Sequence, residues 1–166
     1  VVTLAESLTT VQESREGLGK SGSVLLIGPT DRAKRFNNTQ PASNSTYLPD
    51  RDKYGHILVK FVLPPKTPEG QKDRHDVYQF DSESDNKAFP VKNFPAAFDS
   101  FTKQYDNVNN ASALFNTHNE QDAHVAVGFA RTQTPLANWT VIVEKAKWEA
   151  YKPINTLRNI LLGTVF

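Results

Sequence analysis

The chain has 166 residues, with 38% hydrophobic, 22% charged and 10% aromatic residues and a formal net charge of +1. This composition is typical of a polar globular domain and excludes a wholly disordered chain. The near-zero net charge gives no field that would attract nucleic acid, and the absence of cysteine excludes disulfides, thiolate metal sites and thiol catalysis. We therefore expect a single domain over residues 1–166, with no nucleic-acid partner.

A long helix is predicted over residues 1–20, with Gly17 and Gly19 as its stop signal. Apolar residues recur there at alternating spacings of three and four positions, which places them on one stripe of a helix. Such a stripe packs on the protein's own sheet or against a second copy of the chain. We expect a homodimer whose interface is made by Val1, Leu4, Leu8, Val11 and Leu18.

Two strands are predicted after this helix. Residues 23–27 are apolar on both faces and indicate a buried central strand, and residues 56–63 form the next one. A short edge strand is expected at 77–80. The polar stretches 29–54 and 66–92 otherwise match no motif.

Another helix is predicted next, with Asn93 as its N-cap and Pro95 in its first turn. Aromatic residues recur along it at spacings of four and three, so they share one face of the helix. A face of this kind packs on a core more often than it binds a cofactor. We expect this helix to lie on the sheet through Phe94, Phe98, Phe101 and Tyr105.

Strands at 112–117, 123–132 and 139–146 follow, and their short connections predict an antiparallel meander. Together the elements indicate an α+β fold with about five antiparallel strands over residues 21–146. Large and small residues alternate along the second of these strands, so we expect another element close to its small face. That small face consists of Ala126, Gly128 and Ala130.

A C-terminal exit helix is predicted over residues 147–166, and Pro153 should kink or restart it. The connection from the last strand contains no Gly or Pro, so the helix is expected to follow directly and to move as a rigid lever. Trp148 and Tyr151 are predicted to clamp it on the sheet, with Pro153 as the pivot. The apolar run after Arg158 predicts either the start of a transmembrane helix or a helix docked on its own domain.

Four potential metal ligands, His118, Glu120, Asp122 and His124, occur within seven residues. Alternate residues of an extended segment share a face, and imidazole and carboxylate ligands suit zinc or another divalent ion. The spacing matches no closed structural motif, and a polar turn between two strands explains the same residues. We therefore expect no metal and no cofactor, and keep these four residues as candidates.

Arg131 ends the middle strand of the meander, where its guanidinium could clamp a carboxylate and, together with Tyr78, make a small-molecule site. The alternative is a surface arginine whose stem covers apolar neighbours. No motif of a catalytic centre is present, so no catalytic residue is expected. Glycosylation sequons stand at Asn37, Asn44, Asn110 and Asn138.

Three segments carry a family resemblance. Residues 18–26 (LGKSGSVLL) and 138–144 (NWTVIVE) resemble the helix-to-strand junction and the last strand of extracellular Cache domains, which are PAS-like sensors. Residues 56–153 combine HILVKFVLPP, a phenylalanine-rich helix and HVAVGFARTQTPLANWTVIVEKAKWEAYKP. This combination is similar to the membrane-proximal extracellular region of fungal osmosensing hybrid histidine kinases.

The resemblance implies a PAS/Cache-like fold on the extracellular side of the plasma membrane, followed by a transmembrane helix and a cytoplasmic kinase that works as a homodimer. On this basis we expect a non-enzymatic sensor domain that passes an osmotic, turgor, cell-wall or small-molecule stimulus to a phosphorelay. The alternative hypothesis is a secreted or periplasmic-type small-molecule-binding module with no attached kinase.

Overall fold

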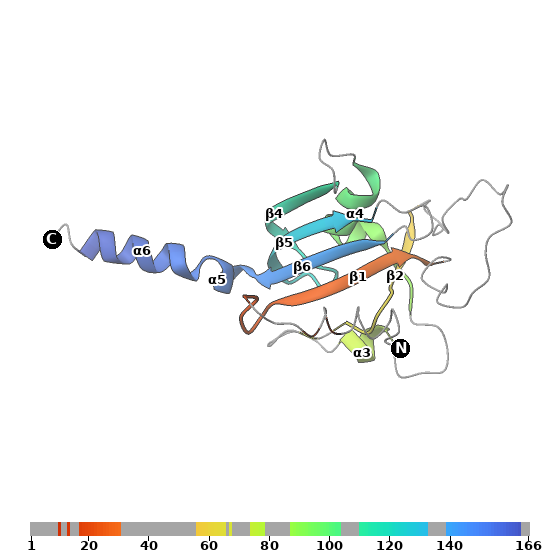
Figure 1. Ribbon diagram of the computed structural model, residues 1–166, viewed down its shortest axis with the longest axis horizontal. Helices are drawn as coiled ribbons and strands as arrows, with labels where there is room; N and C mark the ends of the chain where they lie inside the picture. Colours follow the sequence, from red (N-terminus) through yellow and green to blue (C-terminus); the bar gives the residue numbers. More distant parts are fainter. Residues whose placement is uncertain are drawn as a thin grey trace, which may run out of the picture.

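The computed structural model describes residues 10, 13, 17–30, 56–65, 67, 74–78, 87–103, 110–132 and 139–163. Within these residues the fold is α+β, with one antiparallel sheet in the order β3-β2-β1-β6-β5-β4 (Figure 1). The strands are β1 Ser23–Pro29, β2 Leu58–Phe61, β3 Phe89–Pro90, β4 Ala111–His118, β5 His124–Arg131 and β6 Thr140–Ala146. The helices are α3 Arg74–Tyr78, the 3-10 turn η1 Val91–Asn93, α4 Pro95–Thr102, α5 Lys147–Ala150 and α6 Lys152–Gly163.

The predicted class and the antiparallel meander β4-β5-β6 are confirmed. The predicted central strand is also confirmed, because β1 lies between β2 and β6 and is buried over almost its whole length. The sheet has six strands, one more than expected. The additional strand is the two-residue β3, whose Phe89 pairs with Val59 at the edge of the sheet.

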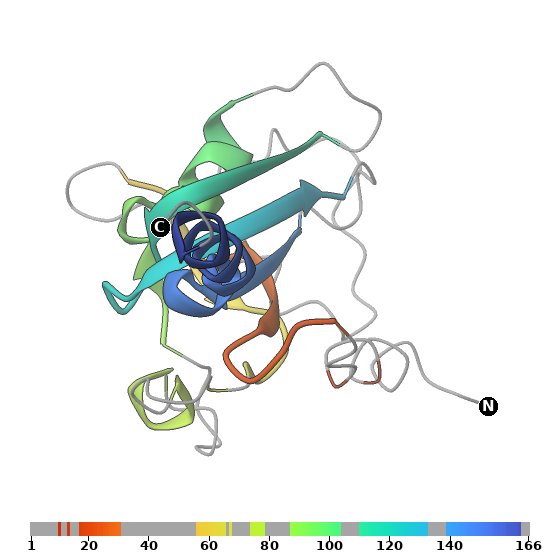
Figure 2. The ribbon, with the colours of Figure 1, turned by 90° about the vertical axis from the view of Figure 1, so that its left-hand side faces the viewer.

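One face of the sheet carries the core, and α3 and α4 both cover that face (Figure 2). The core contains Leu25 and Ile27 of β1, Ile142 of β6, and apolar residues of β2 and β5, all almost inaccessible to solvent. Cross-strand pairs such as Leu25 with Ile142 place these side chains on the same side of the sheet. Burial of this apolar surface is the main contribution to the stability of the domain.

The edge strand predicted at 77–80 is wrong at Val77 and Tyr78, which belong to the helical turn α3, and residues 79–80 lie outside the described residues. Arg74 and Tyr78 of this turn are both buried and lie four positions apart. Helical geometry brings such a pair onto one face about 6 Å apart, whereas an extended chain would separate them by about 13 Å. Arg74 can therefore reach the carboxylates on the sheet while Tyr78 packs against the rings of Phe61 and Phe89.

Helix α4 is present, but two details of the prediction are wrong. Its N-cap is Phe94, without a side-chain cap, and Asn93 lies in the preceding turn η1. Phe98 is 40% exposed, because the residues of α4 that face the sheet are small: Ala96, Ala97 and Ser100. Small side chains allow close packing on the sheet, where the hydroxyls of Ser100 and Thr140 are hydrogen bonded. Phe94 is buried and Phe101 packs against the core as predicted, and Tyr105 lies outside the described residues.

Along β5, the large residues Val125, Val127 and Phe129 are buried and the small residues between them are half-buried. The expected close approach over the small face is wrong at Gly128. A Cβ atom built there would meet nothing within 4 Å among the residues that the structure describes. Among the described residues, Gly128 therefore faces open space on the side of the sheet opposite to the core.

The N-terminal helix falls largely outside the described residues, and Val1, Leu4, Leu8 and Val11 with it. Thr10 and Glu13 are helical, and Gly17 and Gly19 have φ angles of +79° and +73°, which agrees with a stop signal at these glycines. Leu18 lies in the turn between them, so its placement on the helical stripe is wrong.

The C-terminal helix restarts at Pro153, as predicted, because Tyr151 separates α5 from α6 and Pro153 is the second residue of α6. Helix α6 projects away from the sheet along the long axis of the molecule (Figure 1). Its apolar side chains are 58–61% exposed, so it is not docked on its own domain. No helix among the described segments has the length and apolar character needed to span a membrane.

Candidate functional site

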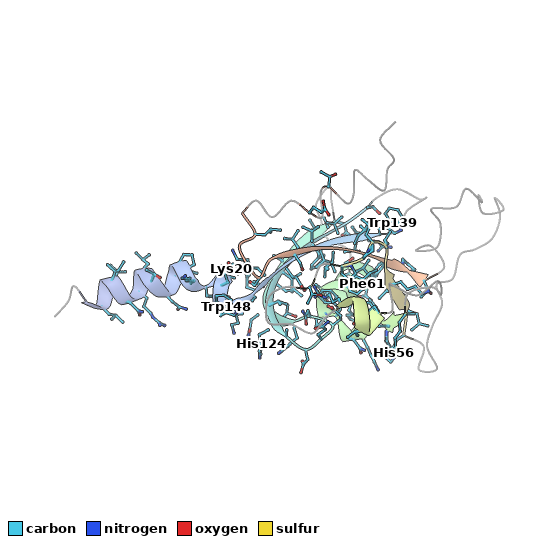
Figure 3. The ribbon with its side chains drawn as sticks, turned by 90° about the horizontal axis from the view of Figure 1, so that it is seen from below. Lys20, His56, Phe61, His124, Trp139 and Trp148 are labelled. Carbon is cyan, nitrogen blue, oxygen red and sulfur yellow. The ribbon has the colours of Figure 1, made fainter. Side chains whose placement is uncertain are left out.

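Hydrogen bonds from two sides hold the junction between the sheet and the exit helix. Strand β6 ends at Ala146 and α5 begins at Lys147, with no residue between them. The predicted direct passage from strand to helix is thus confirmed. Figure 3 shows Lys20 and Trp148, which flank this junction, at the end of the sheet from which α6 leaves.

The carboxylate of Glu149 on α5 is held by the loop that precedes β1. The backbone N–H of Lys20 donates to Oε1 at 3.0 Å, the backbone N–H of Ser21 donates to Oε2 at 2.8 Å, and the Ser21 hydroxyl also donates to Oε2. Consecutive N–H groups around an anion form a concave binding site of the kind called a nest. The Ser21 hydroxyl oxygen in turn accepts the N–H of Ala146 at 3.1 Å, so the loop binds both sides of the strand-to-helix junction.

These hydrogen bonds favour the ionised form of Glu149. The Ser21 hydroxyl and N–H contribute most, and the Lys20 N–H and the Lys145 charge add to them, which lowers the pKa of Glu149 to about 2. The carboxylate is therefore charged at physiological pH.

Gly19 makes room for this carboxylate. A Cβ atom at position 19 would overlap the carboxylate of Glu149, and the φ of +73° is one that other L-residues adopt only with strain. Gly17 has a similar φ of +79°, but a Cβ atom there would meet nothing within 4 Å. Of these two glycines, Gly19 alone is needed for the contact with the exit helix.

The opposite side of the junction is tied to β4. The Lys147 ammonium donates to Oδ1 of Asn116 at 2.7 Å, and the Tyr151 hydroxyl donates to the carbonyl of Phe115 at 3.1 Å. The register of β4 on β5 shifts between Leu114 and Thr117, so Phe115 and Asn116 lie within this irregularity. Such a bulge frees backbone groups from the ladder, which explains how a strand carbonyl can accept a hydrogen bond from the helix.

The exit-helix residues predicted from the sequence are only partly those that make these contacts. Tyr151 does contact the sheet, through its hydroxyl, whereas Trp148 is 64% exposed and does not clamp the helix. Sequence reasoning missed Glu149 and Ser21, which make the densest set of hydrogen bonds. The signal that could have indicated them is the Gly19-Lys20-Ser21 run, since a glycine before consecutive N–H groups is the local pattern of a nest.

A second group of charges lies beneath the same end of β6, inside the core. The Arg74 guanidinium donates to Glu120 through Nε at 2.6 Å and through Nη2 at 3.3 Å, and to Oε1 of Glu144 at 2.5 Å. Ser23 also donates its hydroxyl to Oε1 of Glu144, at 3.0 Å. The three ionic side chains are inaccessible to solvent, so α3, the β4–β5 turn and β6 are joined by a buried arginine with two carboxylates.

Burial is the largest single influence on the pKa values of Arg74, Tyr78 and Glu120. It raises the pKa of Glu120 in spite of the adjacent Arg74 guanidinium, and it also raises the pKa of Tyr78. Burial lowers the pKa of Arg74, but the Glu144 and Glu120 charges more than offset this effect and raise it overall. Among the described residues Oε2 of Glu144 is buried without a hydrogen-bond partner, which leaves one acceptor of the cluster unsatisfied.

The four candidate metal ligands do not gather at one point. Glu120 turns inward to Arg74, and Asp122 occupies an exposed turn position with a φ of +65°. His118 and His124 do lie side by side, with their Nε2 atoms 3.3 Å apart. Across the described segments no group of three or more histidine, aspartate or glutamate side chains could hold a metal ion. The expectation that all four residues share a face is therefore wrong for Glu120.

The other candidates have different surroundings. Arg131 donates to the carbonyl of Ser100 at 3.4 Å and lies over the ring of Phe101, and burial lowers its pKa. Tyr78 packs in the aromatic cluster of β2 and β3, so a joint ligand site with Arg131 stays a prediction. Asn110 precedes β4 with a φ of +44°. The sequons at Asn37, Asn44 and Asn138 lie outside the described residues.

Comparison with known proteins gives no match: no family model, no curated protein and no solved structure is significantly similar to the chain.

Proposed function

We propose that this chain is a non-enzymatic sensor domain of a transmembrane receptor, and that the junction of β6 with α5 is its output. The observation that carries the proposal is the direct passage of a core strand into a projecting helix that is tied on both sides to the sheet. A structural end cap would need no such ties to two separate strands. A transmitting element does need them, because a displacement of the sheet must reach the helix without being lost in a flexible linker.

These hydrogen bonds connect one helix to two different parts of the sheet. Glu149 couples α5 to the loop before β1, and Lys147 and Tyr151 couple it to β4. A stimulus that moves β4 relative to β1 would therefore rotate or shift α5 as a rigid body. The exposed apolar side chains of α6 are consistent with a helix that continues into a membrane or pairs with a second copy: Ile154, Leu157, Ile160, Leu161 and Leu162.

The receptor class that we propose is the hybrid histidine kinase with an extracellular PAS/Cache-like sensor. Support comes from the sequence resemblance and from the position of β1 at the centre of an antiparallel sheet, next to the last strand β6. In this proposal the domain lies outside the plasma membrane, acts as a homodimer and responds to an osmotic, turgor, cell-wall or small-molecule stimulus. The kinase and the phosphorelay residues would lie elsewhere in the parent protein.

A linker insertion tests the output role in a full-length kinase. A Gly-Ser insert between Ala146 and Lys147 should abolish the response of the phosphorelay to the stimulus while basal kinase activity remains. Glu149→Gln should weaken the response, and Lys152→Ala, on the exposed first turn of α6, is the matched control that should retain it. An unchanged response in the insertion variant would show that the signal does not pass through this junction.

The coding sequence beyond Phe166 separates this proposal from the alternative. A transmembrane segment followed by a kinase supports the receptor, and a stop codon supports a secreted or periplasmic-type small-molecule-binding module.

A further inference from the structure

Two histidines face each other across adjacent strands near the junction. His118 ends β4, His124 begins β5, and the two are direct partners in the register of the hairpin. Their ring centroids are 4.1 Å apart and their Nε2 atoms are 3.3 Å apart. His124 is exposed and His118 is half-buried, so the pair lies at the surface of the domain.

The separation of the two nitrogens equals that of two ligands on one tetrahedral zinc ion. With Zn–N bonds of about 2.0–2.1 Å and a tetrahedral angle, two imidazole nitrogens lie about 3.3 Å apart. In the metal-free pair one Nε2 carries the proton of the hydrogen bond between the rings, and a metal ion would replace that proton. The two side chains therefore hold the required spacing before any ion binds.

Contacts with buried side chains hold the hairpin turn between the histidines. The side-chain oxygen of buried Asn119 accepts the N–H groups of Gln121 and Ala123, each at 3.0 Å. Glu120 is held by the buried guanidinium of Arg74. These contacts immobilise the backbone between positions 118 and 124, so little conformational entropy is lost when the two imidazoles bind a common ion.

We propose that His118 and His124 bind one divalent transition-metal ion of the zinc, nickel and copper class through their Nε2 atoms, with water completing the coordination. Imidazole pairs suit these ions, whereas Ca²⁺ and Mg²⁺ prefer oxygen ligands. The inference does not depend on the proposed function. If both hold, the ion would join β4 to β5 in the hairpin whose first strand also ties α5, and it would be a regulator of the junction.

Titration of the untagged chain with Zn²⁺ at pH 7.5 by calorimetry tests the site. One ion should bind per chain, and His118→Gln or His124→Gln should each lower the affinity by more than about tenfold, since loss of even an outer-shell partner costs about 10–100-fold. His56→Gln is the matched control, because His56 lies at the opposite end of the sheet (Figure 3) and should leave binding unchanged.

A second measurement needs no variant. Ni²⁺ should broaden the imidazole NMR signals of His118 and His124 selectively, and Ca²⁺ in excess should not reverse the effect. Equal Zn²⁺ affinity in wild type and in both histidine variants would overturn the proposal, as would Ni²⁺ broadening at His56 to the same extent. Neither outcome bears on the output role of the junction, which the linker insertion tests separately.

Discussion

At two carboxylate sites near the same end of β6, the negative charge is stabilised by different groups. In the core, Glu120 and Glu144 share the guanidinium of Arg74 and are inaccessible to solvent. At the surface, the partly exposed carboxylate of Glu149 is held by the Ser21 hydroxyl and by backbone N–H groups, and no described residue forms an ion pair with it at hydrogen-bond distance.

The difference separates two kinds of contact: the buried cluster joins elements of the core, and the surface contact joins a loop to the exit helix. The buried cluster joins α3, the β4–β5 turn and β6, so its loss disrupts the folded state. The surface contact joins the loop before β1 to α5, so its loss removes one of the two ties of the exit helix, leaves the contacts of Lys147 and Tyr151 with β4, and does not touch the core. Mutations at the two sites should therefore differ in kind as well as in size.

The largest effect is expected for Arg74→Met. Removal of the guanidinium leaves two carboxylates buried without a cation, which destabilises proteins by about 3–5 kcal/mol. Urea unfolding followed by circular dichroism measures this loss as a lower transition midpoint. Glu120→Gln is the matched control and should cost less, because Arg74 keeps its pair with Glu144. A loss below about 1 kcal/mol in Arg74→Met would mean that the cluster is not the stabilising element proposed here.

The next largest effect is expected for Gly19→Ala, compared with Gly17→Ala. Both positions have a positive φ, which costs a non-glycine residue about 1–2 kcal/mol. Gly19→Ala should be the more destabilising, because its methyl group also displaces the Glu149 carboxylate. The excess should vanish when Glu149→Ala is already present. If the two glycine variants unfold at the same urea concentration, the loop does not hold the carboxylate.

The pH dependence of stability isolates the surface site. The pKa of Glu149 is about 2 in the folded protein against an ordinary value of 4.5. Because the folded pKa is the lower one, the stabilisation is fully present above the ordinary pKa and is lost as the pH falls from about 5 towards 2. Glu149→Gln should lack this component, so the difference in melting temperature between wild type and variant should shrink over that range. A difference that is constant with pH would contradict the assignment.

The smallest effect is expected for Trp148→Ala. The side chain is largely exposed, and substitutions at such positions change the free energy of unfolding by no more than about 0.5 kcal/mol. Tyr151→Phe removes the hydrogen bond to Phe115 and should cost about 0.5–1.5 kcal/mol. If Trp148→Ala lowers the melting temperature more than Tyr151→Phe does, Trp148 holds the helix on the sheet as the sequence predicted.

The amino-acid sequence by itself determined the elements whose causes are local. The apolar residues 23–27 predict a buried strand, and Pro153 predicts the restart of the exit helix. Each depends on the side chains of one segment, because periodicity and backbone restrictions act over a few neighbouring residues. The absence of Gly and Pro at the end of β6 was enough to predict a direct passage into α5.

The tertiary structure alone decided where the charged side chains go. Glu120 shares a hairpin with His118 and His124, yet it turns inward because Arg74, 46 residues away, offers a buried cation. The same ion pairs favour a helical turn at Arg74–Tyr78 over the predicted strand. The carboxylate of Glu149 accepts a hydrogen bond from the N–H of Ser21, which is 128 residues away in the sequence. Such contacts depend on which segments the folded sheet brings together, and no local pattern in the chain encodes that proximity.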